Sequence, residues 1–141
     1  MNKKDIYSCL KQNFILFLLS YVLCIVIGTV HFLKGSEVMG ASALLLIFFG
    51  LGSVLGIWNS GKRVYSVREG IVSAAAFYIV MYLLMECMDR YLLNSGSLPF
   101  GIKLYLRVVV TSSHILIYPL LLTVGYYLMD FLCVDRRVKQ I

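Results

Sequence analysis

The sequence predicts an all-α, polytopic integral membrane protein, a bundle of four transmembrane helices that forms one membrane domain over residues 1–141. Four runs contain no charged side chain: residues 12–33, 38–61, 70–85 and 108–129. A bilayer core about 30 Å thick needs roughly 20 apolar residues at about 1.5 Å of rise each, so each run suits a spanning helix. Hydrophobic residues make up 60% of the chain and charged residues 14%, whereas an ordinary soluble domain has about 25% charged residues.

The spans are expected at about residues 13–33, 39–58, 69–90 and 106–132, with an interfacial or projecting segment at 98–107. Their orientation follows from the cations between them, because the side richer in Lys and Arg is normally cytoplasmic. Nine cations fall on the side of the two termini: Lys3, Lys4, Lys11, Lys62, Arg63, Arg68, Arg136, Arg137 and Lys139. The other four, Lys34, Arg90, Lys103 and Arg107, fall on the opposite side. We therefore expect both termini in the cytoplasm.

The net charge of +6 does not indicate a nucleic-acid partner. The cations lie in the gaps between apolar runs rather than along one helix face, and nucleic-acid binding requires such a basic stripe or patch. Lys62, Arg63, Arg68, Arg136 and Arg137 are better explained as topology signals that contact lipid headgroups. The bilayer is thus the expected partner, with a second copy or a larger membrane protein as a further one.

The second run carries small residues at helical spacing. Gly52, Gly56 and Ser60 follow one another at intervals of four. In lipid, close backbone approach at such small-xxx-small positions is a main source of association between helices. Gly70 and Ala74 of the third run have the same spacing, which predicts that helix two packs against helix three within the chain. Packing against another copy is the alternative.

The third span is expected to begin with a capping box, because Glu69 follows Ser66 by three residues. It is expected to continue past the third run into the headgroup region. There Glu86 precedes Arg90 by four residues, the favourable order for a helical ion pair. Both charges are therefore predicted to satisfy each other.

The fourth span contains Pro119. A proline inside a helix removes one backbone hydrogen bond, so the helix should kink near Ile115. Such a kink can act as a hinge, although it is more often a packing device.

Two histidines are the only ionisable side chains in the runs besides thiols and phenols. His31 lies near the end of the first run and His114 near the start of the fourth, so the topology puts them at comparable depths. Facing imidazoles could ligate a b-type haem, bind a metal ion or relay a proton. Hydrogen bonding to neighbours or water is the more common role, and no cofactor is expected.

The chain shows no pattern that would name a reaction. None of the runs holds a mid-membrane Asp, Glu, Lys or Arg, which are costly there and usually serve ion or proton coupling. Metalloprotease, nucleophile-elbow, phosphate-loop and zinc patterns are also missing from the sequence. We therefore expect a protein that is not an enzyme.

Residues 44–91 resemble a domain-of-unknown-function family of small four-helix bacterial membrane proteins. In that family helix two ends in a glycine-rich, basic stretch, and a short polar loop leads into helix three. The residues that carry the resemblance are Gly50-Leu51-Gly52, Gly56-Ile57-Trp58, Lys62-Arg63-Val64-Tyr65 and Gly70. The resemblance covers about a third of the chain and implies a bacterial inner membrane, but no activity.

The leading functional hypothesis is a non-enzymatic accessory subunit, scaffold or small oligomer that works through helix contacts. The alternative is a small oligomeric channel or transporter with Pro119 as its hinge. Its polar path would be lined by Ser42, Ser53, Ser73, Thr111, Ser112 and Ser113. A haem anchor that uses His31 and His114, and an immunity protein that blocks a pore-forming toxin, are further hypotheses.

Overall fold

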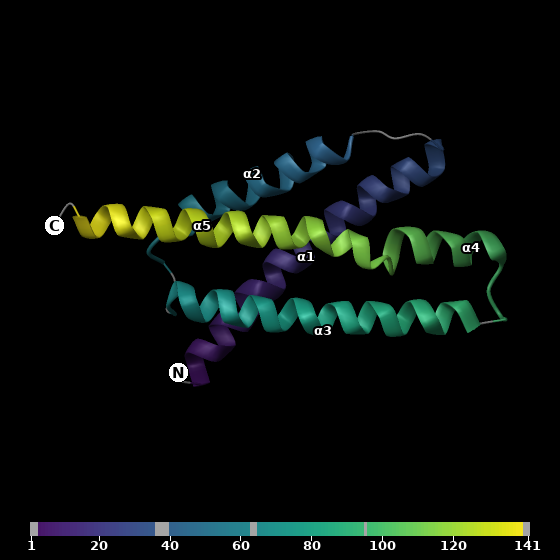
Figure 1. Cartoon of the computed structure of the whole chain (residues 1–141), viewed down its shortest axis with the longest axis horizontal. Coiled ribbons are helices and arrows are strands. Elements are labelled where there is room, and N and C mark those ends of the chain that lie inside the picture. The colour runs from purple at the N-terminus through teal and green to yellow at the C-terminus, as the bar shows by residue number, and fades with distance from the viewer. Residues whose placement is uncertain (1–2, 36–39, 63–64, 95, 140–141) are drawn as a thin grey trace.

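All regular structure in the described part of the chain is helical, which confirms the predicted all-α fold class. The structure is a computed structural model of the whole chain, and it describes residues 3–35, 40–62, 65–94 and 96–139. Figure 1 shows how its helices are arranged. In chain order they are α1 (Lys3–Lys34), α2 (Ala41–Asn59), α3 (Val67–Asn94), α4 (Phe100–Tyr105), the π-helix η1 (Leu106–Val110), the 3-10 helix η2 (Ser113–Leu116) and α5 (Ile117–Lys139).

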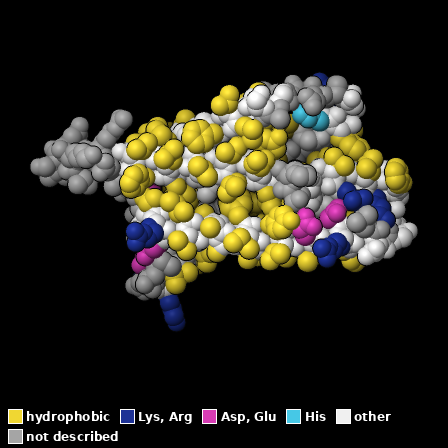
Figure 2. All heavy atoms as spheres, viewed as in Figure 1, with side chains coloured by type: hydrophobic (Ala, Val, Ile, Leu, Met, Phe, Trp, Pro, Cys, Tyr) yellow, Lys and Arg dark blue, Asp and Glu magenta, His cyan; other side chains and the backbone are white. Residues whose placement is uncertain are grey.

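Three helices are long and apolar enough to cross a membrane, namely Lys3–Lys34, Ser42–Asn59 and Val67–Leu92. Their outward faces carry large apolar side chains such as Leu19 of α1 and Val80 of α3, which are 55% and 54% exposed. Extended apolar surface of this kind is rare on soluble monomers. Figure 2 shows apolar side chains across the middle of one face and charged side chains toward its two ends. The surface is that of a membrane-embedded protein.

The fourth predicted span, at residues 106–132, is not one continuous helix. It begins as the π-helix η1, loses regular structure at Thr111 and Ser112, passes through the short helix η2 and resumes as α5. The apolar part of α5, Ile117–Cys133, is shorter than the other three spans. The described part of the chain thus has three helices that are both long and apolar enough to span a membrane, where the sequence predicted four.

The interruption runs from Thr111 through η2 and so includes Ile115, near which the kink is predicted, but Pro119 is not its cause. Pro119 is the third residue of α5, and in the first turn of an α-helix a backbone N–H has no intrahelical partner to lose. The break coincides instead with the run from Val108 to Ser112. There β-branched residues restrict side-chain rotation, and the Thr111 hydroxyl donates a hydrogen bond to the carbonyl of Leu106 at 3.2 Å.

The segment at residues 98–107, for which an interfacial or projecting position is predicted, packs against the end of α1 through Tyr105. The Tyr105 ring packs edge-on against Phe32 of α1 at a centroid distance of 5.4 Å. Its hydroxyl lies 2.9 Å from the Thr29 hydroxyl. These contacts hold the segment against the last turns of α1.

Helices α2 and α5 lie side by side and in parallel, with their backbones in direct contact (Figure 1). A Cβ atom on Gly52 would overlap the carbonyl of Leu122, and one on Gly56 would overlap the carbonyl of Tyr126. In the opposite direction, a Cβ on Gly125 would lie 2.5 Å from the carbonyl oxygen of Phe49. The prediction that helix three is the partner of this glycine face is wrong, because α5 occupies it.

The two small residues predicted to meet that face lie elsewhere. Gly70 of α3 packs against the Tyr127 ring of α5, and Ala74 is buried in the main apolar cluster with Phe48 and Leu122. A large ring on α5 therefore takes the space beside the small residues of α3. The prediction identified positions of close packing but paired them incorrectly.

Candidate functional site

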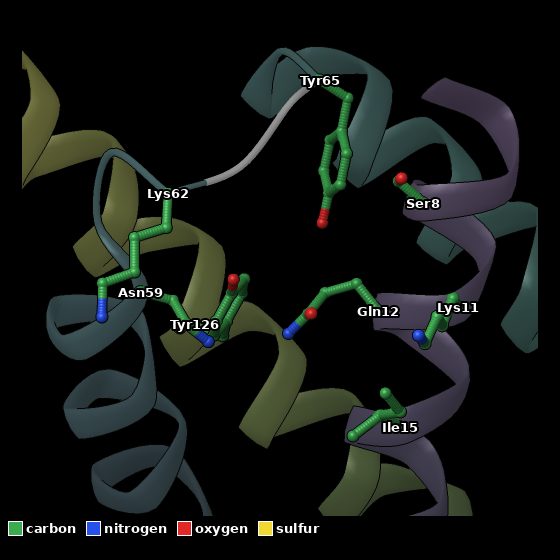
Figure 3. Close-up of a pocket in the computed structure, with 8 residues that line it drawn as sticks. All are labelled: Ser8, Lys11, Gln12, Ile15, Asn59, Lys62, Tyr65 and Tyr126. Carbon is green, nitrogen blue, oxygen red and sulfur yellow. The ribbon is translucent and has the colours of Figure 1, made fainter. Parts of the chain in front are cut away.

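An open pocket of about 370 Å³ lies between the first turns of α1 and the end of α2 (Figure 3). The Tyr65 side chain points into the pocket from the segment before α3, and Tyr126 of α5 also lines the pocket. Its lining consists of Ser8, Lys11, Gln12, Ile15, Asn59, Lys62, Tyr65 and Tyr126. Most of these residues carry a polar group, although the pocket is built between apolar helices.

Local structure explains how these side chains converge. Ser8, Lys11, Gln12 and Ile15 follow the i, i+3, i+4, i+7 pattern that places residues on one helix face. On the other wall, α2 ends and its chain turns sharply. Gly61 has a positive φ of 78°, a conformation that glycine adopts without strain. The turn brings the N–H of Lys62 back to the carbonyl of Asn59 at 3.0 Å, so both residues face the pocket.

A buried hydrogen-bond network lies next to the pocket. Tyr127 donates its hydroxyl to the Asn13 side-chain oxygen at 2.7 Å, and the Asn13 amide donates to the carbonyl of Gly70 at 3.4 Å. The hydroxyl of Tyr65 lies 3.4 Å from that of Tyr127. Because Asn13 and Tyr127 are both buried, these bonds tie α1, α3 and α5 together at this end of the bundle.

The predicted capping box is confirmed at the start of α3. The Ser66 N–H donates to the Glu69 carboxylate at 2.9 Å, and the Glu69 N–H donates to the Ser66 hydroxyl at 3.2 Å. The Cys9 thiol contacts the carbonyl of Glu69 at 3.6 Å. The capping box thus fixes the start of α3, directly after Tyr65, which lines the pocket.

Several buried polar residues were not predicted, among them Asn13 and Asp130. Asn13 lies at the edge of the first predicted span, and Asp130 lies one residue beyond the fourth uncharged run. Asp130 is fully buried, and Ser60, the third member of the predicted packing set, is buried as well. The helical spacing could have predicted that Asp130 is buried. It follows Leu122 and Tyr126 at intervals of four, and those two residues lie on the face of α5 that meets α2.

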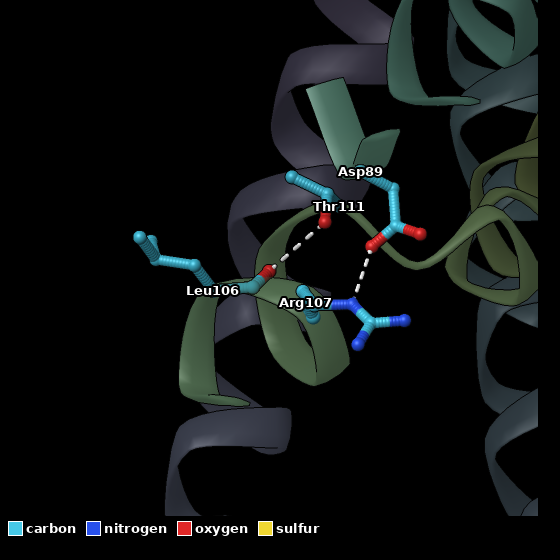
Figure 4. A network of polar contacts seen from close by, with 4 residues as sticks. All are labelled: Asp89, Leu106, Arg107 and Thr111. Atoms are coloured by element: carbon cyan, nitrogen blue, oxygen red, sulfur yellow. Dashed lines mark hydrogen bonds and ion pairs between the residues drawn. The ribbon is translucent and has the colours of Figure 1, made fainter. Parts of the chain in front are cut away.

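A second polar cluster lies at the far end of α3, where Arg107 donates to the Asp89 carboxylate at 2.9 Å (Figure 4). The pair borders a pocket of about 440 Å³, which Glu86 and Thr111 also line. No ion pair joins Glu86 to Arg90 among the described residues. The predicted pair is therefore not formed, and the acid that does pair is Asp89, with a cation from η1.

His31 lies near the end of α1, and the backbone of residue 114 belongs to η2 (Ser113–Leu116). Upstream of η2, Val109 lies against Gly28 of α1, and Tyr21 donates to the carbonyl of Val110. The facing arrangement of the two imidazoles stays a prediction. The side chain of His114 itself lies outside the described residues.

The polar path predicted for a channel is divided among separate places. The Ser53 hydroxyl donates to the carbonyl of Phe49 at the α2–α5 contact, Ser73 lies beside Cys9, and Thr111 bonds to Leu106 at the opposite end of the bundle. Ser42 is exposed, and the side chain of Ser113 is not described. The described members of this set therefore do not line one path.

The Lys and Arg residues that are predicted to act as topology signals have different surroundings. Lys62 lines the polar pocket and lies 6.0 Å from the centroid of the Trp58 ring. Arg68 is exposed at the start of α3 and borders an apolar groove between α3 and α5. Arg63 and the side chains of Arg136 and Arg137 lie outside the described residues.

Comparison of the chain with family models, curated proteins and solved structures finds no match. The resemblance to a family of small four-helix membrane proteins therefore stays a prediction from the residues that carry it.

Proposed function

We propose that the chain is a non-enzymatic integral membrane protein that acts as an accessory or scaffold subunit. In this proposal it crosses a bacterial cytoplasmic membrane four times, and the broken fourth segment completes the last crossing together with α4 and η1. Both termini then lie in the cytoplasm. The proposal is supported by Figure 1, in which the N- and C-terminal ends lie toward the same end of the bundle.

The observation that carries the subunit role is the interlocked contact of α2 with α5. Because the backbone of α5 fills the glycine face of α2, that face serves the fold of the single chain. The outward face of α3 is then the surface offered to a partner, with exposed Ile79, Val80, Leu83 and Leu84. A larger membrane protein or a second copy could cover it.

Topology can be tested with the natural cysteines. Cys87 on α3 is exposed and Cys133 on α5 is half-buried, whereas Cys9 and Cys24 are buried. A membrane-impermeant maleimide should label Cys87 in intact cells and Cys133 only after permeabilisation. Cys9 and Cys24 should react only after denaturation. Labelling of Cys87 and Cys133 from the same side would contradict four crossings.

The partner surface can be tested by photo-crosslinking in native membranes. A benzophenone side chain at Leu84, which is exposed on α3, should give a covalent protein adduct whose mass identifies a second copy or another protein. The same group at Leu122, which is buried against α2, should give none between chains. Lipid adducts alone at Leu84 would contradict the subunit role.

The broken fourth segment favours one second candidate, a small transporter. Discontinuous helices expose backbone carbonyls within the membrane and frequently mark ion or substrate sites in transporters. Here the π-turn at Leu106–Val110 adjoins the pocket that holds Asp89 and Arg107. Solute flux into proteoliposomes that is lost in Asp89→Asn but retained in Glu69→Gln would favour this candidate over the scaffold.

A further inference from the structure

We propose that the pocket between α1 and α2 binds an anionic, phosphate-bearing group. This inference goes beyond the proposed function, and it does not depend on which side of the membrane the pocket faces. It rests on the charge of the lining, on hydrogen-bond donors that meet no protein acceptor, and on the size and support of the pocket.

The lining is positively charged. Lys11 comes from α1 and Lys62 from the turn after α2, so the two cations stand on opposite sides of the pocket (Figure 3). None of the eight described lining residues carries a carboxylate. Lysine ammonium groups bind phosphate as point charges. The Lys62 ammonium is turned toward the Trp58 ring, away from the centre of the pocket, so its flexible side chain must rotate to meet an anion beside Lys11.

Neutral donors surround the same space. In the described part of the chain, no side-chain hydrogen bond involves Ser8, Gln12 or Asn59, and no ion pair involves Lys11. The amides of Gln12 and Asn59 each offer two N–H donors, and the Ser8 hydroxyl offers one. All three side chains are half-exposed in the open pocket, and a ligand that covers them must supply acceptors in place of water, because an unpaired donor costs free energy. A group with several charged oxygens would satisfy them together, whereas an apolar ligand would leave them unpaired.

The size and the walls fit a small group. About 370 Å³ lies toward the lower end of the volumes found for ligand pockets. Ile15 adds one apolar contact at the edge that continues along α1. Behind the pocket, Tyr65 is held against Tyr127, which in turn bonds Asn13. Such support fixes the wall before the ligand arrives, which lowers the entropy cost of binding.

Two sources could supply this chemistry, a phospholipid headgroup in the adjoining leaflet or a soluble phosphate ester. The full chain, purified in an uncharged detergent, separates them. One arm adds phosphatidylglycerol in mixed micelles, with phosphatidylcholine as the reference lipid. The other arm adds glycerol 3-phosphate. Trp58 is the single tryptophan and lies beside Lys62, so its fluorescence reports on this site, and native mass spectrometry counts retained lipid.

We expect saturable binding of at least one of the two phosphate probes. A double variant, Lys11→Gln with Lys62→Gln, should weaken it about tenfold or more, because each hydrogen bond to a charged group contributes about 1.5–3 kcal/mol. The matched control is Lys3→Gln with Lys4→Gln, which removes the same charge from the first turn of α1 without touching the lining. Its affinity should stay within about twofold of the natural chain.

Binding of phosphatidylglycerol alone would assign a lipid headgroup, and binding of glycerol 3-phosphate alone a soluble ester. The proposal is overturned if neither probe binds more tightly than phosphatidylcholine, or if both double variants lose affinity equally. Should the lysine variant fail to fold, Gln12→Met removes one amide at similar volume. It should then weaken binding about threefold or more, as expected for one lost hydrogen bond, and unchanged affinity would also overturn the proposal.

Discussion

The backbone carbonyl of Leu122 on α5 occupies the place where a side chain on Gly52 of α2 would begin. The same contact recurs one turn later between Gly56 and Tyr126, with both pairs separated by 70 residues in sequence (122 − 52 and 126 − 56). Equal separation means that the two helices run parallel and stay in register. Dispersion and weak backbone contacts then hold the pair, because lipid supplies no hydrophobic drive between helices.

Gly52→Ala should destabilise the folded chain by at least about 2 kcal/mol, because its new methyl group would overlap backbone that cannot move independently of α5. Gly50→Ala is the control, since a Cβ there meets nothing within 4 Å. That change should stabilise the helix by about 0.5 kcal/mol through the lower entropy of alanine. Reversible unfolding in mixed detergent measures both. Equal effects would show that α5 does not fill this face.

Tyr127→Phe should cost about 1 kcal/mol, because it removes the donor to the Asn13 side-chain oxygen and leaves a buried acceptor unpaired. The same unfolding assay applies, with Tyr91→Phe as the matched control on the exposed part of α3. Removal of that solvent-facing hydroxyl should change the free energy of unfolding by less than about 0.5 kcal/mol. A larger loss at Tyr91 than at Tyr127 would contradict the network.

A double-mutant cycle on Asp89→Asn and Arg107→Gln should give a coupling of about 0.5 kcal/mol, which is modest because the two side chains keep 30% and 40% exposure. The parallel cycle on Glu86→Gln and Arg90→Gln tests the pair expected from sequence. It should give a coupling near zero, since those side chains form no ion pair in the structure. The reverse ranking would restore the sequence-based pairing.

Glu69→Ala should lower stability by about 0.5–1 kcal/mol, because the carboxylate no longer accepts from the Ser66 N–H at the start of α3. Glu69→Gln keeps an acceptor of the same shape and should retain most of that stability. Thermal unfolding of the two variants side by side separates the hydrogen bond from the charge. Equal losses would assign the effect to charge alone.

Much of the fold could be read from local patterns. The capping box at Ser66 and Glu69 needs only two residues at fixed spacing, and the glycine spacing at Gly52 and Gly56 marks close packing whatever its partner. The polar pocket was not predicted, since Lys11 and Lys62 are 51 residues apart (62 − 11) and each was explained separately as a topology signal. Their meeting depends on how α1 lies against the end of α2.

Hydropathy and helical spacing are properties of neighbouring residues, so they are enough to predict a helical protein built for a membrane. Packing in three dimensions places α5 against the glycine face of α2, breaks the fourth run near Thr111 and pairs Asp89 rather than Glu86 with a cation. Each of these outcomes depends on competition between partners distant in the chain. Sequence spacing describes what a residue can contact, while packing selects which contact forms.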